Sequence, residues 1–264
     1  MPKECESKMT NILDRFRLDG RTALVTGASR GLGQAIALAL AEAGANVVCH
    51  VQPGLDEDVA CQVRARGRQA AVVSGDFSDP AVPARLVGEA EAALGPIDIL
   101  VNNAGTIRRA PAAEHSDEDW DLVLAVDLSA AFRLAREVGR RLIARGAPGK
   151  IVNIASLLAF QGGILVPSYA AAKGGLAQLT KALANEWAPR RINVNAIAPG
   201  YMRTDNTLAL RQDETRSRQI LERIPAARWG EPEDVAGAAV FLACAAGDYV
   251  NGHVLVVDGG WLAR

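Results

Sequence analysis

Short apolar runs alternate with longer segments of helical character along most of this chain. The apolar runs read TALVTG, NVVCHV, QAAVVSGD, IDILVNNAG, KIVNIAS, INVNAIAPG and HVLVVDGG. Each run is nearly continuous, as expected for parallel strands that are buried on both faces. Helices are predicted between them over residues 33–44, 56–66, 80–94, 117–144 and 169–187, with a loop and further helices over 201–243.

This order of strands and helices predicts an α/β protein built on one doubly wound parallel sheet. Right-handed crossovers place helices on both faces, which gives a three-layer αβα architecture of the Rossmann type. The 264 residues suit a single domain, which we expect to span residues 18–264 after an N-terminal tail of residues 1–17. Ligand sites in such sheets lie at the carboxyl ends of the strands.

The composition narrows the class of partner. Apolar residues make up 49% of the chain and charged residues 22%, which is enough for a full core, and the net charge is −1. This balance gives no electrostatic argument for nucleic acid or for an anionic membrane. We see no apolar signal-peptide stretch and no run that could span a bilayer. We therefore expect a cytoplasmic protein with a small-molecule partner.

Cysteine and histidine residues give no indication of a metal site. The four cysteines form no C-x-x-C pair and no zinc spacing. Cys49 and Cys244 fall in apolar runs and are expected to be buried thiols, which fits a reducing compartment. The histidines at 50, 115 and 253 are scattered, and we predict no catalytic or metal-binding role for them.

The first apolar run ends in a glycine-rich turn, TGASRGLG. Its glycines, Gly27, Gly31 and Gly33, have the spacing G-x-x-x-G-x-G rather than G-x-G-x-x-G. Gly27 permits a tight turn from strand to helix, and the other two let the backbone approach a pyrophosphate. Ser29 and the helix N-terminus can supply hydrogen-bond donors. By itself, the pattern is equally compatible with an ordinary glycine-rich turn.

A second candidate group consists of Ser156, Tyr169 and Lys173. Ser156 ends a predicted strand, and the other two lie four residues apart on one helix face. A free phenol is only about 0.1% ionised at pH 7, so an effective acid–base group needs a pKa lower by about three units, roughly 4 kcal/mol. A nearby ammonium and an oxidised nicotinamide both lower that pKa. Taken alone, a tyrosine–lysine pair is more often an ordinary surface feature.

The chain resembles the short-chain dehydrogenase/reductase family in a set of motifs that follow the family's order. They are TGASRGLG, Asp76, NNAG at residues 102–105, Ser156 with the YAAAK run, and PG at residues 199–200. The resemblance spans residue 18 to the C-terminus. It implies an NAD(P)-dependent oxidoreductase acting on CH–OH groups, and a homotetramer. It also implies cofactor contacts from Gly27, Ser29, Arg30, Gly31, Leu32, Gly33, Asp76, Phe77, Asn103, Ala104, Gly105, Tyr169, Lys173, Pro199, Gly200, Met202 and Thr204.

One position departs from the family pattern. Where the family has an asparagine that completes a catalytic tetrad, this chain has Asp127 in AVDLSAAF. In the family, the residue acts mainly through its backbone carbonyl, and an aspartate could keep that geometry. A carboxylate would also favour a charged Lys173 and perturb the proton relay. We include Asp127 among the candidate catalytic residues.

Substrate loops resemble a branch of the family that acts on sugar acids from uronate breakdown. The stretches are NNAGTIRR, AFQGGILVPSYAAAKGG, APGYMRTDNT, RIPAARWG and DYVNGHVLVVDGGWLAR. They imply 2-keto-3-deoxygluconate or a related gluconate as substrate. Arg108, Arg109 and Arg203 could pair with its carboxylate, and Gln161 could bind its hydroxyls. Each arginine could instead be a solvated surface charge.

Other functions remain open from the sequence. Related enzymes would be a gluconate 5-dehydrogenase or a 3-oxoacyl-thioester reductase. The second would be expected to bind a carrier protein through a basic surface, for which the near-neutral charge gives little support. A non-catalytic dinucleotide-binding regulatory protein would not need Ser156, Tyr169 and Lys173.

The choice between NADP and NAD depends on the end of the second strand. An NAD-specific site usually has an acid there to bind the ribose hydroxyls. Val51 and Gln52 occupy these positions, and Arg30 of the glycine turn could pair with a 2′-phosphate. Asp56 and Glu57 lie slightly downstream and oppose this preference. We predict NADP as the preferred cofactor, with NAD as the alternative.

Overall fold

The centre of the molecule is a seven-stranded sheet with the strand order β3-β2-β1-β4-β5-β6-β7, and every pairing is parallel. We describe residues 11–55 and 58–264 of a computed structural model. The strands are β1 (Thr22–Val25), β2 (Asn46–Val51), β3 (Ala70–Ser74), β4 (Ile99–Asn102), β5 (Gly149–Ile154), β6 (Ile192–Pro199) and β7 (Val254–Val257). All seven predicted strands are therefore present.

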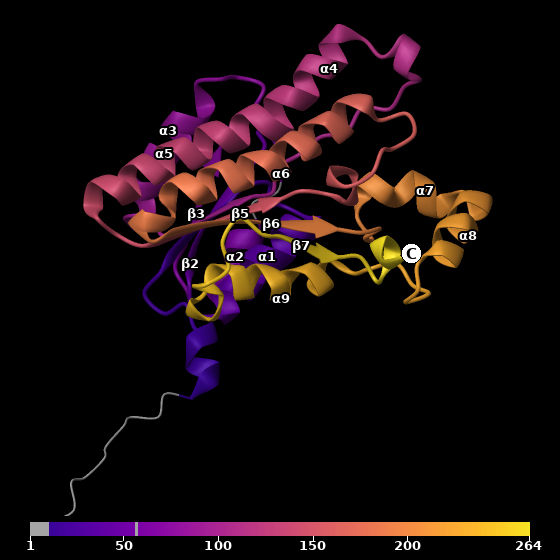
Figure 1. The fold of residues 1–264 in the computed structure, drawn as a ribbon. Coiled ribbons are helices and arrows are strands. Elements are labelled where there is room, and N and C mark those ends of the chain that lie inside the picture. Colours follow the sequence, from indigo (N-terminus) through magenta and orange to yellow (C-terminus); the bar gives the residue numbers. More distant parts are fainter. Residues whose placement is uncertain (1–10, 56–57) are drawn as a thin grey trace, which may run out of the picture.

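Helices cover both faces of the sheet (Figure 1). One face carries α1 (Gly31–Glu42), α2 (Asp58–Ala65) and α9 (Pro232–Ala243). The other carries α3 (Val82–Leu94), α4 (Asp117–Leu124), α5 (Ala130–Arg145) and α6 (Pro167–Trp187). Two short helices, α7 (Leu208–Gln212) and α8 (Glu214–Arg223), lie beyond the carboxyl ends of β6 and β7. The predicted Rossmann-type αβα fold is confirmed.

Burial explains why the strands could be predicted from the sequence. All four residues of β1 and all four of β4 are buried, because each strand has neighbours on both sides and helices on both faces. Two large apolar clusters fill the spaces above and below the sheet. Cys49 and Cys244 belong to one of them, so their predicted burial is confirmed.

The predicted long helix over residues 117–144 is interrupted. A π-helical turn, Ala125–Ser129, separates α4 from α5. In a π-helical turn the backbone hydrogen bonds join residues five apart instead of four, which adds one residue to the turn. Such turns are frequently found at functional sites. Here it turns Asp127 into the interior, where the residue is 1% exposed. Apolar residues flank Asp127 on both sides, so the sequence pattern alone does not reveal the turn.

The N-terminal part of the described chain forms a short 3-10 helix, Ile12–Phe16. The Arg15 guanidinium donates to the Ala245 carbonyl, and the Phe16 and Phe241 rings lie 6.5 Å apart. Residues 1–10 lie outside the described part, so the division at residue 17 stays a prediction. Within the described residues, no helix combines the length and apolar character needed to cross a membrane.

The sheet order creates a crevice at the carboxyl ends of the strands. The chain runs outward from β1 to β2 and β3, and then returns to place β4 on the other side of β1. The loops after β1 and β4 therefore leave in opposite directions, and a gap opens between them. The glycine-rich turn follows β1 and the NNAG segment follows β4, so both border this gap.

Candidate active site

A cleft of about 820 Å³ lies at these strand ends. Its lining includes every residue for which cofactor contact was predicted, together with Ser156, Asp127, Arg108 and Arg203. The lining comes from the ends of strands and the loops after β1 to β6, from helices α1, α4, α6 and α9, and from the π-helical turn before α5. Gln161 is not among the lining residues, because its side chain oxygen accepts a hydrogen bond from the indole nitrogen of Trp261 (3.2 Å).

The glycine turn has the geometry needed for a phosphate group. Gly27 and Gly31 have φ angles of +64° and +56°, which a side chain would strain. A Cβ on Gly33 would lie 2.1 Å from the Gly27 carbonyl oxygen, so only glycine lets α1 start this close to the strand. The side chain of Arg30, the N-cap residue of α1, makes no capping hydrogen bond. Its first N–H groups remain available for an anion, and these residues fit a dinucleotide pyrophosphate.

The NNAG segment locks the glycine turn in place. The hydroxyl oxygen of Thr26 accepts hydrogen bonds from the backbone N–H groups of Asn103 (2.9 Å) and Ala104 (3.0 Å). The Asn103 amide donates to the carbonyls of Thr26 (2.9 Å) and Gly27 (3.1 Å). Two loops far apart in the sequence therefore form one rigid wall of the cleft.

His50 is a site residue that the sequence analysis missed as a functional contributor. It lies at the end of β2, lines the cleft, and is 2% exposed. Its Nδ1 accepts from the Gly27 N–H (3.1 Å), and its Nε2 lies 3.0 Å from the Gly75 carbonyl oxygen. An N–H can only donate and a carbonyl can only accept, so these partners fix the neutral tautomer with the proton on Nε2. A histidine inside the apolar run NVVCHV was the sequence feature that could have indicated this role.

A buried polar chain positions the helix that carries the catalytic candidates. The Asn102 amide donates to the Asn153 side chain oxygen (2.9 Å), and the Asn153 amide donates to the Thr180 hydroxyl (2.9 Å). Thr180 lies on α6 and donates to the Leu176 carbonyl (2.8 Å). These hydrogen bonds hold α6 in a fixed position along β4 and β5.

The structure brings Ser156, Tyr169 and Lys173 together at one end of the cleft. The Lys173 Nζ donates to the Ile154 carbonyl (2.9 Å) and lies 5.3 Å from the centre of the Tyr169 ring. Burial raises the pKa of the Tyr169 phenol above its ordinary value, although the Lys173 ammonium and a hydrogen bond with Ser156 lower it. The sequence led us to expect a net lowering. In the protein alone, burial outweighs the ammonium.

Asp127 contacts this group directly through its carboxylate. Its Oδ2 lies 3.1 Å from the Lys173 Nζ, and its Oδ1 accepts from the Thr106 N–H (2.7 Å). Burial lowers the pKa of Lys173, but the charge of Asp127 offsets this and the net shift is upward. The ammonium is therefore the form of Lys173 that this site holds.

The candidate arginines have protein partners. Arg108 pairs with Asp119 (3.1 Å) and Arg203 with Glu231 (3.0 Å), and both line the cleft. Arg109 does not line it; its guanidinium donates to the Asn206 carbonyl (3.0 Å). Its charge nevertheless contributes to lowering the pKa of Tyr169.

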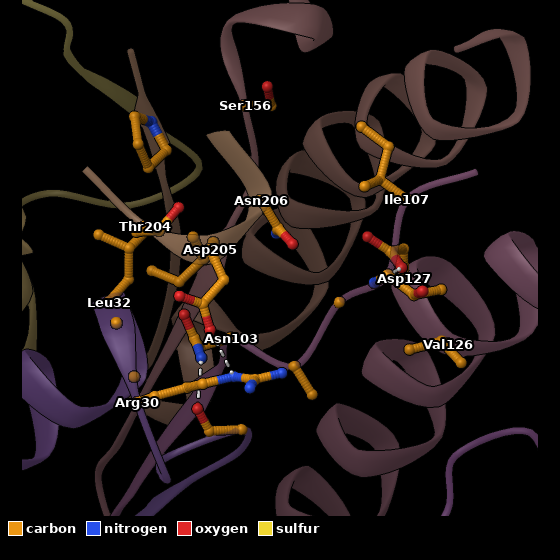
Figure 2. Close-up of a pocket in the computed structure, with 18 of the residues that line it drawn as sticks. Arg30, Leu32, Asn103, Ile107, Val126, Asp127, Ser156, Thr204, Asp205 and Asn206 are labelled. Atoms are coloured by element: carbon orange, nitrogen blue, oxygen red, sulfur yellow. Dashed lines mark hydrogen bonds and ion pairs between the residues drawn. The ribbon is translucent and has the colours of Figure 1, made fainter. Parts of the chain in front are cut away.

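Arg30 crosses the cofactor end of the cleft and pairs with Asp205. Their Nε and Oδ2 atoms lie 3.2 Å apart, and the side chains are 65% and 68% exposed. Figure 2 shows Asp205 reaching Arg30 from the segment after β6, on the side of the cleft away from Asp127. An exposed pair of this kind is weak and can exchange partners. Asp205 is not among the residues predicted from the sequence, and only its position two residues after Arg203 could have suggested it.

Comparisons with known proteins agree with this geometry. A family model described as enoyl-(acyl carrier protein) reductase matches residues 27–262. The 2-dehydro-3-deoxy-D-gluconate 5-dehydrogenase of Pseudoalteromonas atlantica is 55% identical over 256 residues, covering 96% of this chain and 100% of that protein. The chain belongs to the short-chain dehydrogenase/reductase family of oxidoreductases.

Two solved structures are similar over nearly the whole chain. One is a candidate 2-deoxy-D-gluconate 3-dehydrogenase from Agrobacterium tumefaciens with bound NADP, with 56% identity, a TM-score of 0.88, and coverage of 95% of this chain and 99% of that one. The other is a gluconate 5-dehydrogenase from Burkholderia cenocepacia in complex with NADP and tartrate. It has 43% identity, a TM-score of 0.91, and coverage of 96% of this chain and 100% of that one.

Proposed function

We propose that this protein is an NAD(P)-dependent dehydrogenase that interconverts a secondary alcohol and a ketone on a sugar acid, with 2-keto-3-deoxygluconate as the first candidate. The observation that carries the proposal is the assembly of Ser156, Tyr169 and Lys173 at one end of a cleft whose other end suits a dinucleotide. The relative at 55% identity is named for this substrate.

NADP is the cofactor that we propose, with NAD as the alternative. Similar proteins have been crystallised with NADP. The glycine turn and the uncapped start of α1 would hold the pyrophosphate. Of the described residues that follow β2, Gln52 and Leu55 line the cleft and neither is acidic, while Asp56 and Glu57 lie outside the described residues. Arg30 could donate to a 2′-phosphate in place of Asp205. The nicotinamide supplies or takes up the hydride when bound.

The remaining chemistry belongs to the protein's own side chains. Tyr169 holds the proton that passes to or from the substrate oxygen, and the Ser156 hydroxyl can donate to that same oxygen. Lys173 is held in place by the Ile154 carbonyl and presents its positive charge to the phenol. This charge stabilises the phenolate that remains when Tyr169 has given up its proton.

A carboxylate on the substrate would find cationic partners near the catalytic group. Arg108 and Arg203 line the cleft, and Arg109 lies close enough to influence Tyr169. Arg108 and Arg203 are half-exposed, so a bidentate pair with a substrate carboxylate could replace their exposed partners. The gluconate 5-dehydrogenase with bound tartrate, a small hydroxy acid, supports this substrate class.

A substrate panel tests the proposal. We expect turnover of 2-keto-3-deoxygluconate or a gluconate, measured by nicotinamide absorbance with both cofactors, to exceed that of neutral sugars of similar size. Highest turnover with gluconate would favour a gluconate 5-dehydrogenase. Highest turnover with neutral sugars or 3-oxoacyl thioesters would reject a sugar acid. Cofactor binding with no turnover on the whole panel would favour a regulatory protein.

We also propose a cytoplasmic homotetramer in which residues 18–264 form one catalytic domain. Trp120 on α4 and Phe132 and Ile143 on α5 are each 37% exposed, and Tyr249 before β7 is fully exposed. Large apolar side chains at the surface favour burial between copies. Light scattering at a mass of about four 27.8 kDa chains would support this assembly, and a monomer would reject it.

A further inference from the structure

The carboxylate of Asp127 forms a buried ion pair with Lys173. Asp127 is 1% exposed and Lys173 is 3% exposed, and their charged atoms are 3.1 Å apart. Water screens such a pair very little. Burial raises the pKa of Asp127 above its ordinary value, while the Lys173 ammonium and the Thr106 N–H oppose this and favour its ionised form. The charges of the pair reach Tyr169 with little screening.

A second contact prevents the carboxylate from turning away. Its Oδ1 accepts from the Thr106 N–H (2.7 Å), and a Cβ on Gly105 would lie 2.9 Å from Oδ2. The π-helical turn Ala125–Ser129 supplies the backbone that points the side chain inward. The orientation of Asp127 is therefore fixed from both sides.

The family's usual asparagine would not make the same contacts here. Its amide oxygen could still accept from the Thr106 N–H. Its NH₂ group would then face the Lys173 ammonium, and two donors would oppose each other. A carboxylate accepts from the Thr106 N–H and forms an ion pair with the ammonium, so the aspartate suits a direct contact with the lysine.

Tyr169 is influenced by both members of this pair. Burial raises its pKa most, the Lys173 ammonium lowers it, and Asp127 raises it. Ser156 and Arg109 contribute smaller lowering effects. Within the described part of the chain, the charged groups that shift this pKa are Lys173 from α6, Asp127 from the turn before α5 and Arg109 from the loop after β4.

We propose that Asp127 is a positioning and charge-balancing residue, which holds Lys173 and makes proton loss from Tyr169 harder than it would be beside the ammonium alone. The inference rests on the proposed function, in which Tyr169 exchanges a proton with the substrate. Asp127 touches neither substrate nor cofactor in this role. It acts by cancelling part of the charge that Lys173 presents to the phenol.

The test is a titration of Tyr169 in Asp127→Asn. The chain has three tyrosines, so the near-ultraviolet absorbance of phenolate can be followed, with Tyr169→Phe in each background to isolate Tyr169. We expect the Tyr169 midpoint to fall by about one pH unit, a tenfold gain in phenolate below the midpoint. The ascending limb of the pH profile for oxidation should move in the same direction.

Asp98→Asn is the matched control. Asp98 accepts from the Thr22 N–H (3.2 Å) and lies 3.9 Å from Arg21 and 3.8 Å from Arg145, at the opposite end of the strands. Its loss should leave the Tyr169 midpoint unchanged. A midpoint in Asp127→Asn that is unchanged or higher than in the parent would overturn the inference.

Two features keep the test decisive. If Asp127→Asn does not fold, carbon-13 NMR of the parent can follow the Asp127 carboxyl: an ionised group throughout the Tyr169 titration supports the inference, and a protonated group at neutral pH overturns it. The titration also needs no substrate. Absence of sugar-acid turnover would therefore count against the proposed function and leave the role of Asp127 separately measured.

Discussion

At the scale of single residues, the site depends on pairs that are distant in the sequence. Arg30 meets Asp205, Asp127 meets Lys173, and His50 meets Gly27. The sequence predicted Arg30 and Gly27 but neither Asp205 nor His50 as a site residue, because no local pattern specifies a through-space partner. It predicted both Asp127 and Lys173, and the structure adds their direct contact. Charge and burial therefore had to come from the structure, including the direction of the pKa shift at Tyr169.

The pair at Arg30 leads to a prediction about cofactor choice. Replacing Arg30 by alanine should weaken NADP(H) binding by about ten- to a hundredfold, because a charged hydrogen bond contributes roughly 1.5–3 kcal/mol. NAD(H) has no 2′-phosphate, so its affinity should change little. Titration of both cofactors into parent and variant measures the ratio, and an unchanged ratio would refute the role of Arg30.

His50 predicts a dependence of stability on pH. Burial lowers the pKa of His50 below its ordinary value, so the folded state takes up this proton less readily than the unfolded state. Its contribution is present above pH about 6.5 and is lost as the pH falls through the folded pKa, with a slope of at most about 1.4 kcal/mol per pH unit.

Denaturant unfolding between neutral and mildly acidic pH measures this effect. Parent protein should lose stability on acidification more steeply than His50→Asn, which removes the titrating ring. Replacing the exposed His253 by asparagine provides the control and should keep the parent's slope. Equal slopes in the parent and His50→Asn would contradict the assignment.

At the scale of elements, the strands could be predicted well and the π-helical turn could not. Strands β1 and β4 are apolar throughout because they are buried on both faces, and this leaves a continuous pattern in the sequence. The turn Ala125–Ser129 keeps apolar neighbours on either side and changes only the backbone hydrogen bonds. The pattern of apolar and polar positions does not reveal such a change.

The start of α1 gives an element-scale prediction. Gly33→Ala places a Cβ 2.1 Å from the Gly27 carbonyl oxygen and 2.5 Å from the Asn103 Nδ2, so the strand–turn–helix unit must shift. We expect a loss of about 1–3 kcal/mol in unfolding free energy and weaker cofactor binding by at least about tenfold.

A second glycine supplies the comparison. A Cβ on Gly237 of α9 would meet nothing within 4 Å, so Gly237→Ala should raise stability by up to about 1 kcal/mol and leave cofactor binding unchanged. Calorimetry with NADP on both variants separates the two effects. Equal cofactor affinities would show that close approach at Gly33 is not needed.

At the scale of the whole molecule, the sheet order determines where chemistry can occur. Reversal of direction beside β1 opens the crevice, and the loops after β1, β4, β5 and β6 bring their residues to it. The predicted cofactor and catalytic residues meet there because the carboxyl ends of parallel strands share one edge. Topology, more than any single motif, unites a dinucleotide site with an acid–base group.

We propose that this cleft is the active site of a sugar-acid dehydrogenase in which Tyr169 carries the proton. The most direct measurement compares kcat/KM for 2-keto-3-deoxygluconate reduction in the parent and in Tyr169→Phe, with NADPH affinity measured on both. We predict a loss of at least about a hundredfold in kcat/KM with NADPH affinity retained, because only the hydroxyl is removed. Turnover of the variant within about tenfold of the parent would contradict this role of Tyr169.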